Sequence, residues 1–165
     1  MIKIASRKSW GARTARPRTK QSDSQIREFF LHHPADPHDL SHIDTDKEHD
    51  AYMRAIQDFH MDTRGWADFA YSFAVFQDGA VYRGRGRNYV PAAQLGHNTG
   101  TIAVLCVVGD REKPTDHLYS SLVRLKNRMD SEVGRDLRAR AHSDVFATEC
   151  PGSQIRALLP RLNTH

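Results

Sequence analysis

The apolar run from Ile102 to Val108 constrains the fold of this chain more than any other segment. It reads IAVLCVV, without a charged or amide side chain. A strand with one face in water alternates apolar and polar residues, so a continuous run rich in β-branched residues predicts a central strand covered on both faces. Cys106, inside this run, is expected to be a buried structural thiol.

Hydrophobic periodicity and turn signals predict the elements around this strand. Ile26–Leu31 suits a strand that Pro34 and Pro37 end, so His32 falls at the end of a strand. Asp78-Gly79 is the strongest short hairpin signal, because both turn positions tolerate positive φ. The expected elements in chain order are a strand at 26–31, a helix at about 47–60, a hairpin at 71–76 and 80–82, the strand at 102–108, a helix from Leu118 through Val133 closed by Gly134, a strand at 137–142, and a helix at 155–162 with Ser153 as its N-cap. This order predicts an α/β (α+β) class, with a central mixed β-sheet flanked by helices.

The length of 165 residues fits one domain, 1–165, that can bury a core without disulfides. Residues 1–24 are rich in Arg, Lys, Ser and Thr and show little periodicity, which predicts an irregular, partly ordered N-terminal arm. Trp10 is expected to anchor this arm. The two cysteines, Cys106 and Cys150, lie in different settings, so we expect no disulfide between them.

Charge and hydropathy narrow the possible partners. Lys and Arg number 24 against 20 acidic residues, which gives a net charge of +4 and a pI near 9.3. This excess favours an acidic or polyanionic partner but is too small to indicate nucleic acid. No apolar stretch approaches the roughly 18 residues that span a bilayer, and no charged-then-apolar leader opens the chain. We therefore expect no membrane insertion, no signal peptide and synthesis in the cytosol.

Two imidazoles and one thiol stand at positions where they could share a metal ion. His32 ends the first strand, His142 ends the strand at 137–142, and Cys150 follows among turn residues and polar groups. Zinc accepts nitrogen and sulfur, and a catalytic zinc keeps three protein ligands with a fourth position open. We therefore predict a Zn²⁺ site made of His32, His142 and Cys150. A buried thiol beside a surface imidazole is the alternative interpretation, whereas a structural zinc site would need a fourth protein ligand that the sequence does not offer.

Six stretches in order along nearly the whole chain carry a resemblance to a known family. They are Ser9–Arg13 (SWGAR), Leu31–His33 (LHH), Phe59–Phe73 (FHMDTRGWADFAYSF), Asp78–Gly86 (DGAVYRGRG), Gly96–Thr99 (GHNT) and His142–Gly152 (HSDVFATECPG). Each is weak alone. Together they resemble the zinc amidases of the peptidoglycan recognition protein superfamily, the type 2 N-acetylmuramoyl-L-alanine amidases that include phage lysins. The resemblance implies the fold of these amidases.

The resemblance also implies the chemistry. The family's three zinc positions fall on the two histidines and the cysteine named above, and its catalytic positions fall on Tyr71 and Thr148. The implied reaction is hydrolysis of the amide that joins the lactyl group of N-acetylmuramic acid to L-alanine of the stem peptide in bacterial peptidoglycan. Zinc would lower the pKa of bound water to about 7, Tyr71 would donate a hydrogen bond to the developing oxyanion, and Thr148 would orient water or stabilise the same charge. The general base stays open, because Glu149 adjoins a ligand but neighbouring residues usually point apart.

Four further residues are candidates for substrate contact. In the family the Gly96–Thr99 stretch lies along the substrate groove, so His97 and Asn98 are expected to contact glycan or peptide, although His97 could also cap a turn. Trp66 is either a packing residue or a substrate platform. Arg85 is either a bidentate partner for a stem-peptide carboxylate or an exposed arginine without a role.

The remaining histidines are expected to serve the fold or the surface. Alternation along the strand sends His33 to the face opposite His32, which predicts that it supports either the metal ligands or the fold. The histidines predicted to be solvated at the surface are His38, His42, His49, His117 and His165.

Departures from the family pattern bear on the biological role. Arg87 stands where many relatives carry Trp, and Ser72 stands where the family pattern has Asn. The close disulfide of animal recognition proteins has no counterpart here. Arg87 and Ser72 concern contacts beyond the scissile bond, whereas the missing disulfide and the missing leader favour a phage or bacterial lytic enzyme over an immune receptor. Of these we expect the catalytic module of a phage endolysin. Such an enzyme would act as a monomer and stay in the host cytoplasm until a holin or a similar route admits it to the bacterial cell wall.

A peptidoglycan-binding recognition module without catalysis is the alternative function. Receptors of this superfamily usually lack the zinc cysteine. The presence of Cys150 together with Tyr71 therefore favours the enzyme.

Overall fold

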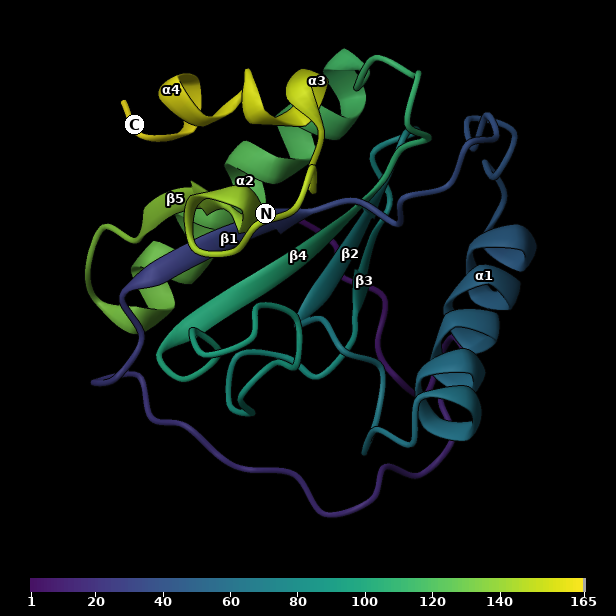
Figure 1. Cartoon of the computed structure of the whole chain (residues 1–165), viewed down its shortest axis with the longest axis horizontal. Helices are drawn as coiled ribbons and strands as arrows, with labels where there is room; N and C mark the ends of the chain where they lie inside the picture. Colours follow the sequence, from purple (N-terminus) through teal and green to yellow (C-terminus); the bar gives the residue numbers. More distant parts are fainter. Residues whose placement is uncertain (165) are drawn as a thin grey trace.

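The computed structural model describes residues 1–164 and shows a five-stranded sheet with helices around it (Figure 1). The strands are β1 (Glu28–His32), β2 (Phe73–Phe76), β3 (Val81–Arg83), β4 (Thr101–Val107) and β5 (Arg138–Ala141). The helices are α1 (Asp46–Asp58), α2 (Asp116–Val133), α3 (Ser153–Arg156) and α4 (Leu159–Leu162), with a π-helical turn, η1 (Phe59–Thr63), and a 3₁₀ turn, η2 (His142–Asp144).

The sheet is mixed, and its strands lie in the order β3-β2-β4-β1-β5. The hairpin expected around Asp78-Gly79 is confirmed, since β2 and β3 pair antiparallel. β4 pairs parallel with both β1 and β2, and β5 pairs parallel with β1. The predicted class, a central mixed sheet flanked by helices, is therefore confirmed. Because β1, β4 and β5 run the same way, their C-terminal ends meet at one edge of the sheet.

The core has two parts, one on each face of the sheet. Val104 and Cys106 of β4 belong to a cluster that includes the buried leucines of α2. Leu105 and Val107 alternate with them and belong to a second cluster that contains Met53 of α1. Figure 1 shows α2 and the C-terminal helices together, well apart from α1. The prediction that the 102–108 run forms a central strand covered on both faces is confirmed, as is the burial of Cys106.

Both long helices begin at residues whose side chains satisfy free backbone N–H groups, and α2 also ends at a residue that caps it. Thr45 caps α1 in a reciprocal capping box with Glu48. The Thr115 hydroxyl accepts the Leu118 N–H at the start of α2. α2 ends at Gly134, which has a φ of 79° and whose N–H donates to the carbonyl of the helix's last turn. The helix predicted from Leu118 to a Gly134 stop is confirmed.

The C-terminal segment differs from the single helix predicted over 155–162. It forms α3 and α4, two short helices, and Gly152 rather than Ser153 is the N-cap of α3. Pro160 explains the interruption, because it lies in the first turn of α4 and has no N–H to continue a hydrogen-bond ladder. Within residues 1–164, no helix combines the length and the apolar character needed to cross a bilayer.

The N-terminal arm is irregular, as predicted, but it is tied to the sheet. Trp10 is fully buried, and its Nε1 donates to the Arg83 carbonyl at 2.8 Å. An isolated bridge joins Ala5 to Tyr82 of β3. Trp10 is therefore confirmed as the anchor of the arm.

The prediction that His49 is a solvated surface residue is wrong. Its side chain is 1% exposed, its ring lies 4.3 Å from that of Phe76, and its Nε2 lies 3.1 Å from an Asp78 oxygen. His49 is buried because it shares the inner face of α1 with Met53, one helical turn later. The histidines at 38, 42 and 117 are exposed as predicted, and His165 lies outside the described residues.

Candidate metal centre

Strand pairing brings the two predicted histidine ligands together. β1 and β5 are parallel neighbours, with Leu31 opposite Ala141. The residues that follow this pair are His32 and His142. Both therefore lie at the C-terminal edge of the sheet, at equivalent positions on neighbouring strands. Their ring centroids are 4.8 Å apart. Two imidazoles that are distant in sequence therefore become neighbours through backbone hydrogen bonding alone.

The loop after η2 carries Cys150 back to the same edge. The Ser143 N–H donates to the Cys150 carbonyl at 3.0 Å and closes the loop. The Cys150 Sγ lies 3.6 Å from His32 Nδ1, and the His33 N–H points at the same sulfur at 3.4 Å. Within the described part of the chain, the donor atoms of His32, His142 and Cys150 lie within 4.8 Å of one another. The three predicted ligands thus converge on one point.

The distance between the donor atoms of His32 and Cys150 fits zinc. A tetrahedral zinc, with a Zn–N distance of about 2.05 Å and a Zn–S distance of about 2.3 Å, holds nitrogen and sulfur about 3.6 Å apart. The distance from His32 Nδ1 to Cys150 Sγ is 3.6 Å. Two imidazole nitrogens and a thiolate are also donors that zinc prefers, and three protein ligands leave one position for water or substrate. The residues therefore fit a catalytic zinc.

Burial sets the protonation of the three side chains. It lowers the pKa of His32 to about 3, and the neighbouring His142 acts in the same direction. Burial also lowers the pKa of His142, so both imidazoles are neutral near pH 7 and each offers a lone pair. Burial raises the pKa of the Cys150 thiol to about 11, an effect that the His33 N–H partly opposes. A thiolate that burial disfavours is stabilised strongly by a bound cation.

Gln94 contacts the site and is not among the residues predicted from the sequence. Its side chain is fully buried, and its Oε1 lies 2.8 Å from His32 Nε2. It stands two residues before the Gly96–Thr99 stretch, and no periodicity or motif marks it as buried. Its position becomes evident only when the loop between β3 and β4 is folded against β1.

Tyr71 lies beside the candidate ligands. Its ring centroid is 5.2 Å from that of His32. Its carbonyl accepts the Arg85 N–H at 2.9 Å, and the next residue, Ser72, is hydrogen-bonded to β4. Burial raises the pKa of Tyr71, and the nearby Cys150 acts in the same direction. The phenol is therefore protonated at neutral pH and can donate a hydrogen bond.

Thr148 lies in the loop that carries Cys150. Its Oγ1 accepts the Cys150 N–H at 3.2 Å. Because the oxygen serves as the acceptor in this contact, the hydroxyl hydrogen can be donated elsewhere. Glu149 is exposed, and no geometry here assigns it the role of general base.

Exposed aromatic rings adjoin the cluster. The Trp66 side chain is 38% exposed, and its ring centroid lies 4.9 Å from that of His60, which in turn lies 6.0 Å from Tyr71. Phe146 is 45% exposed and stacks on His142 at 5.5 Å. Neither His60 nor Phe146 is among the predicted site residues, although both lie inside the stretches that carry the family resemblance.

Arg85 fits neither of the two interpretations predicted for it, a substrate contact or an exposed residue without a role. The residue is 7% exposed, its Nε donates to the Phe69 carbonyl at 2.7 Å, and its Nη1 donates to the Val90 carbonyl at 3.0 Å. The first bond holds the segment that precedes Tyr71, and the second holds the loop between β3 and β4 at Val90. A buried guanidinium that is directed at carbonyl groups inside the protein does not fit the predicted pairing with an external carboxylate.

The predicted contacts His97 and Asn98 lie in the same loop as Gln94 but face different surroundings. His97 is exposed. The Asn98 Oδ1 accepts the N–H groups of Ala93 and Gln94, both at 2.9 Å. The side-chain oxygen of Asn98 therefore shapes the loop, whereas His97 is free to meet a ligand.

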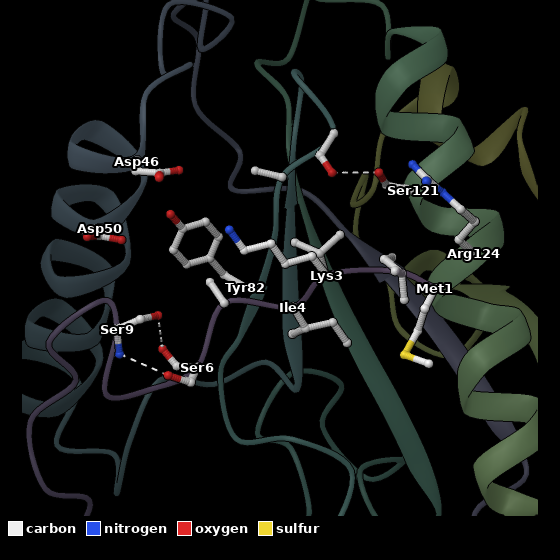
Figure 2. A pocket seen from close by; sticks show the side chains of 15 residues that line it. Met1, Lys3, Ile4, Ser6, Ser9, Asp46, Asp50, Tyr82, Ser121 and Arg124 are labelled. Carbon is white, nitrogen blue, oxygen red and sulfur yellow. Dashed lines mark hydrogen bonds between the residues drawn. The ribbon is translucent and has the colours of Figure 1, made fainter.

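A cavity of about 630 Å³ lies elsewhere and shares no residue with the metal cluster. Figure 2 shows Tyr82 and Lys3 near its middle, with two carboxylates of α1 on one side and Arg124 of α2 on the other. Its volume alone would make it the first candidate for a site. The nitrogen and sulfur atoms that could bind a metal nevertheless lie at the C-terminal edge of the sheet and not in this cavity.

No family model matches the sequence, but the sequence is similar to N-acetylmuramoyl-L-alanine amidases and peptidoglycan-recognition proteins. It is 34% identical over 162 residues to the N-acetylmuramoyl-L-alanine amidase of Homo sapiens, a match that covers 91% of this chain and 26% of the human protein. It is 31% identical over 160 residues to peptidoglycan-recognition protein SC2 of Drosophila simulans, which covers 93% of this chain and 83% of the fly protein. The chain thus spans about a quarter of the length of the human relative.

Solved structures show the same architecture. Drosophila PGRP-LB superposes with a TM-score of 0.86 at 27% identity, over 95% of this chain and 92% of that chain. A mutant of PGRP-LB in complex with tracheal cytotoxin superposes with a TM-score of 0.85 at 27% identity, over 93% of this chain and 90% of the other. The arrangement of sheet and helices described above is therefore the fold of these structures.

Proposed function

This chain belongs to the family of peptidoglycan-recognition proteins and N-acetylmuramoyl-L-alanine amidases, and we propose that it is a zinc-dependent amidase. Its substrate is the amide between N-acetylmuramic acid and L-alanine of the stem peptide. The observation that carries this proposal is the convergence of His32, His142 and Cys150, with Nδ1 and Sγ 3.6 Å apart. A protein that only binds the wall has no need of a partly buried thiol that faces two neutral imidazoles.

Three different parts of the chain hold the proposed ligands. His32 ends β1, His142 begins η2 beside it, and Cys150 is fixed by the hydrogen bond that closes its loop. When bound, zinc supplies a Lewis acid that polarises the scissile carbonyl and acidifies water. Ligands on a rigid sheet edge stay in position as substrate enters.

Two hydroxyl groups complete the proposed chemistry. Tyr71 stays protonated because burial raises its pKa, and its ring lies beside His32. It donates a hydrogen bond to the oxygen of the scissile carbonyl as negative charge develops there. Thr148 directs its hydroxyl hydrogen either to that oxygen or to the attacking water. Both groups act as donors and need no change of charge.

Peptidoglycan binding is part of the same proposal. The mutant of Drosophila PGRP-LB, which is 27% identical to this chain, was solved in complex with tracheal cytotoxin. In this chain the exposed His97 and the partly exposed Trp66 are the side chains that we propose contact glycan or peptide. The net charge of +4 suits an anionic polymer.

We further propose that the protein is the catalytic module of a phage endolysin. Both cysteines are free, one in the core and one at the site, which suits synthesis in a reducing cytoplasm. The enzyme then reaches the wall of the host when a holin opens the membrane. Expression in a bacterial host is expected to cause lysis only when a holin is co-expressed. Absence of lysis under that condition would contradict the endolysin role.

A recognition module without catalysis is the second candidate. It is favoured by the similarity to Drosophila peptidoglycan-recognition proteins. Against it stand Cys150 and Tyr71, since binding alone needs neither a thiol that converges with two imidazoles nor a tyrosine beside them.

The test is release of free stem peptide from purified sacculi, with and without a chelator, for the native chain and Cys150→Ser. We expect release by the native chain, loss of release with the chelator, recovery on zinc addition, and no release by Cys150→Ser. Cys106→Ala is the matched control, because it removes the other thiol from the core and should keep activity.

The outcomes separate the two candidates. Release that persists in chelator and in Cys150→Ser would show that the metal mechanism is wrong. Binding to sacculi without release by the zinc-loaded native chain would establish the recognition module instead.

A further inference from the structure

We propose that Gln94 is a positioning residue that fixes the tautomer and ring orientation of His32, so that Nδ1 faces Cys150. The inference rests on the proposed function, since the position it prepares is that of the zinc. Gln94 lies in the loop between β3 and β4 and is fully buried. Its Oε1 lies 2.8 Å from His32 Nε2, 62 residues away in sequence.

The orientation of the Gln94 amide follows from its other partners. Its Nε2 lies 2.7 Å from Thr101 Oγ1 and 3.2 Å from the His97 carbonyl, which can only accept. The Thr101 hydroxyl donates its hydrogen to the Asn98 carbonyl at 2.8 Å, so its oxygen is left to accept from Gln94. The amide NH₂ must therefore face Thr101 and His97. The amide oxygen is left to face His32.

The orientation of the amide decides which nitrogen of His32 carries the proton. A carbonyl oxygen is only an acceptor, so His32 Nε2 must be the N–H that donates to it. A neutral imidazole has a single N–H, and its other nitrogen keeps the lone pair. That nitrogen is Nδ1, the atom 3.6 Å from Cys150 Sγ. The hydrogen bond with Gln94 therefore leaves the lone pair pointing towards the thiol and the metal position.

The loop around Gln94 is itself held in place. Asn98 Oδ1 accepts the N–H of Gln94, and Thr101 is the first residue of β4. Gln21 donates to the Thr101 carbonyl at 2.8 Å and accepts the Gly100 N–H at 2.9 Å. The support therefore extends from the N-terminal arm through β4 to Gln94. Histidine ligands of metals commonly donate their second N–H to an acceptor of this kind, and a carboxamide orients the ring without adding charge.

The experiment reads the tautomer of His32 in the metal-free protein and the zinc affinity separately. The tautomer is measured by NMR on protein labelled with ¹⁵N-histidine, and the affinity by competition with a chromogenic chelator. Gln94→Met removes the acceptor at similar length. Gln57→Met is the matched control, because Gln57 is also a buried amide, bonded to Asp68 and Arg13.

We expect the native chain to show the Nε2-protonated tautomer of His32. Gln94→Met should give mixed tautomers and a loss of zinc affinity of about 10- to 100-fold, whereas Gln57→Met should match the native chain in both. Gln94→Glu keeps an acceptor for His32 and should keep the Nε2 tautomer, which guards against misfolding of the Met variant. Circular dichroism checks the fold of each variant.

Two results would overturn the inference. One is a proton on Nδ1 of His32 in the metal-free native chain, and the other is native zinc affinity in a folded Gln94→Met. If the native chain keeps the Nε2 tautomer but binds no zinc, the proposed function fails, while the role of Gln94 in orienting His32 stands.

Discussion

Burial moves the ionisable side chains around the site towards their uncharged forms. It lowers the pKa of His32 to about 3 and that of His60 to about 4, and it raises the pKa of Tyr71. Near neutral pH the site therefore presents imidazole lone pairs and a protonated phenol. Substrate and metal meet preformed donors and acceptors, and no side chain among these three must change its charge first.

Tyr71→Phe tests the role of the phenol. We expect kcat to fall about 100- to 1000-fold, because a hydrogen bond that strengthens in the transition state is lost. Zinc affinity should not change, since the hydroxyl is not one of the three convergent donors. Stem-peptide release measures kcat, and chelator competition measures affinity. Tyr119→Phe, on α2, is the matched control. Native kcat in zinc-loaded Tyr71→Phe would exclude the proposed role.

His60→Asn tests the effect of a buried imidazole on stability. His60 is 7% exposed and accepts the Ala70 N–H at Nδ1, a bond that an asparagine oxygen can replace. Burial, followed by the charges of Arg85 and Arg64, lowers the pKa of His60 to about 4. An exposed histidine has a pKa of about 6.5. The unfolded chain therefore binds an extra proton between about pH 6.5 and pH 4, and the free energy of unfolding falls as the pH falls through this window.

The shift at His60 corresponds to roughly 3 kcal/mol over that window. Urea unfolding of chelator-treated protein as a function of pH should show a shallower acid loss for His60→Asn than for the native chain. His117→Gln, which changes an exposed histidine of α2, should leave the native slope. Equal slopes for the native chain and His60→Asn would contradict the assignment.

At the scale of elements, the site depends on how loops join the strand ends. The segment before β2 carries Tyr71. It is hydrogen-bonded to the segment after β3, where Gly84 lies. A Cβ on Gly84 would overlap the Tyr71 carbonyl oxygen and the Phe69 ring. The absence of a side chain at position 84 is therefore what allows these two segments to meet.

Two glycine substitutions distinguish a loss of stability that also lowers kcat from a loss of stability that leaves kcat unchanged. Gly84→Ala should destabilise the protein by about 1 to 3 kcal/mol and lower kcat, because the Tyr71 backbone must move. Gly134→Ala should cost about 1 to 2 kcal/mol through its positive φ of 79°, since no atom lies within 4 Å of the added Cβ, and should leave kcat unchanged. Urea unfolding and stem-peptide release measure the two effects. Native kcat in Gly84→Ala would show that Tyr71 tolerates the shift.

At the scale of the whole molecule, the hydrophobic core that stabilises the fold is separate from the proposed metal site. The two apolar clusters lie on the faces of the sheet, whereas the convergent donors lie at the ends of its strands. A small zinc domain unfolds when its metal is removed, because the ion replaces a core. This protein has a core on each side of its sheet and should behave differently.

Chelation should abolish amidase activity and leave a cooperatively folded protein. Zinc at about 1,000 times its Kd stabilises a folded protein by about 4 kcal/mol, which raises the Tm of a chain of this size by about 10 °C. Calorimetry with and without chelator measures the shift, and Cys150→Ser should show almost none. Loss of the unfolding transition on chelation would mean that the metal is part of the core.

Much of the fold could be predicted from the sequence, because its signals are local. The apolar run at 102–108 specifies a buried strand, and Asp78-Gly79 and Gly134 specify a hairpin and a helix end through their own backbone preferences. The convergence of the three candidate ligands was predicted from strand ends and family resemblance. Periodicity, turn chemistry and spacing are properties of neighbouring residues, so they can be seen before the chain folds.

Only the tertiary structure decided which polar side chains are buried and what they contact. His49 was predicted at the surface and is buried. Arg85 was predicted to be either a substrate contact or an exposed residue without a role, and instead it is buried and holds backbone carbonyls. Gln94 was not predicted at all. Each of these outcomes depends on segments far apart in sequence, such as the 62 residues between Gln94 and His32. The burial and hydrogen-bond partners of a polar group are set by the segments that pack around it, and the pattern of its own neighbours does not contain them.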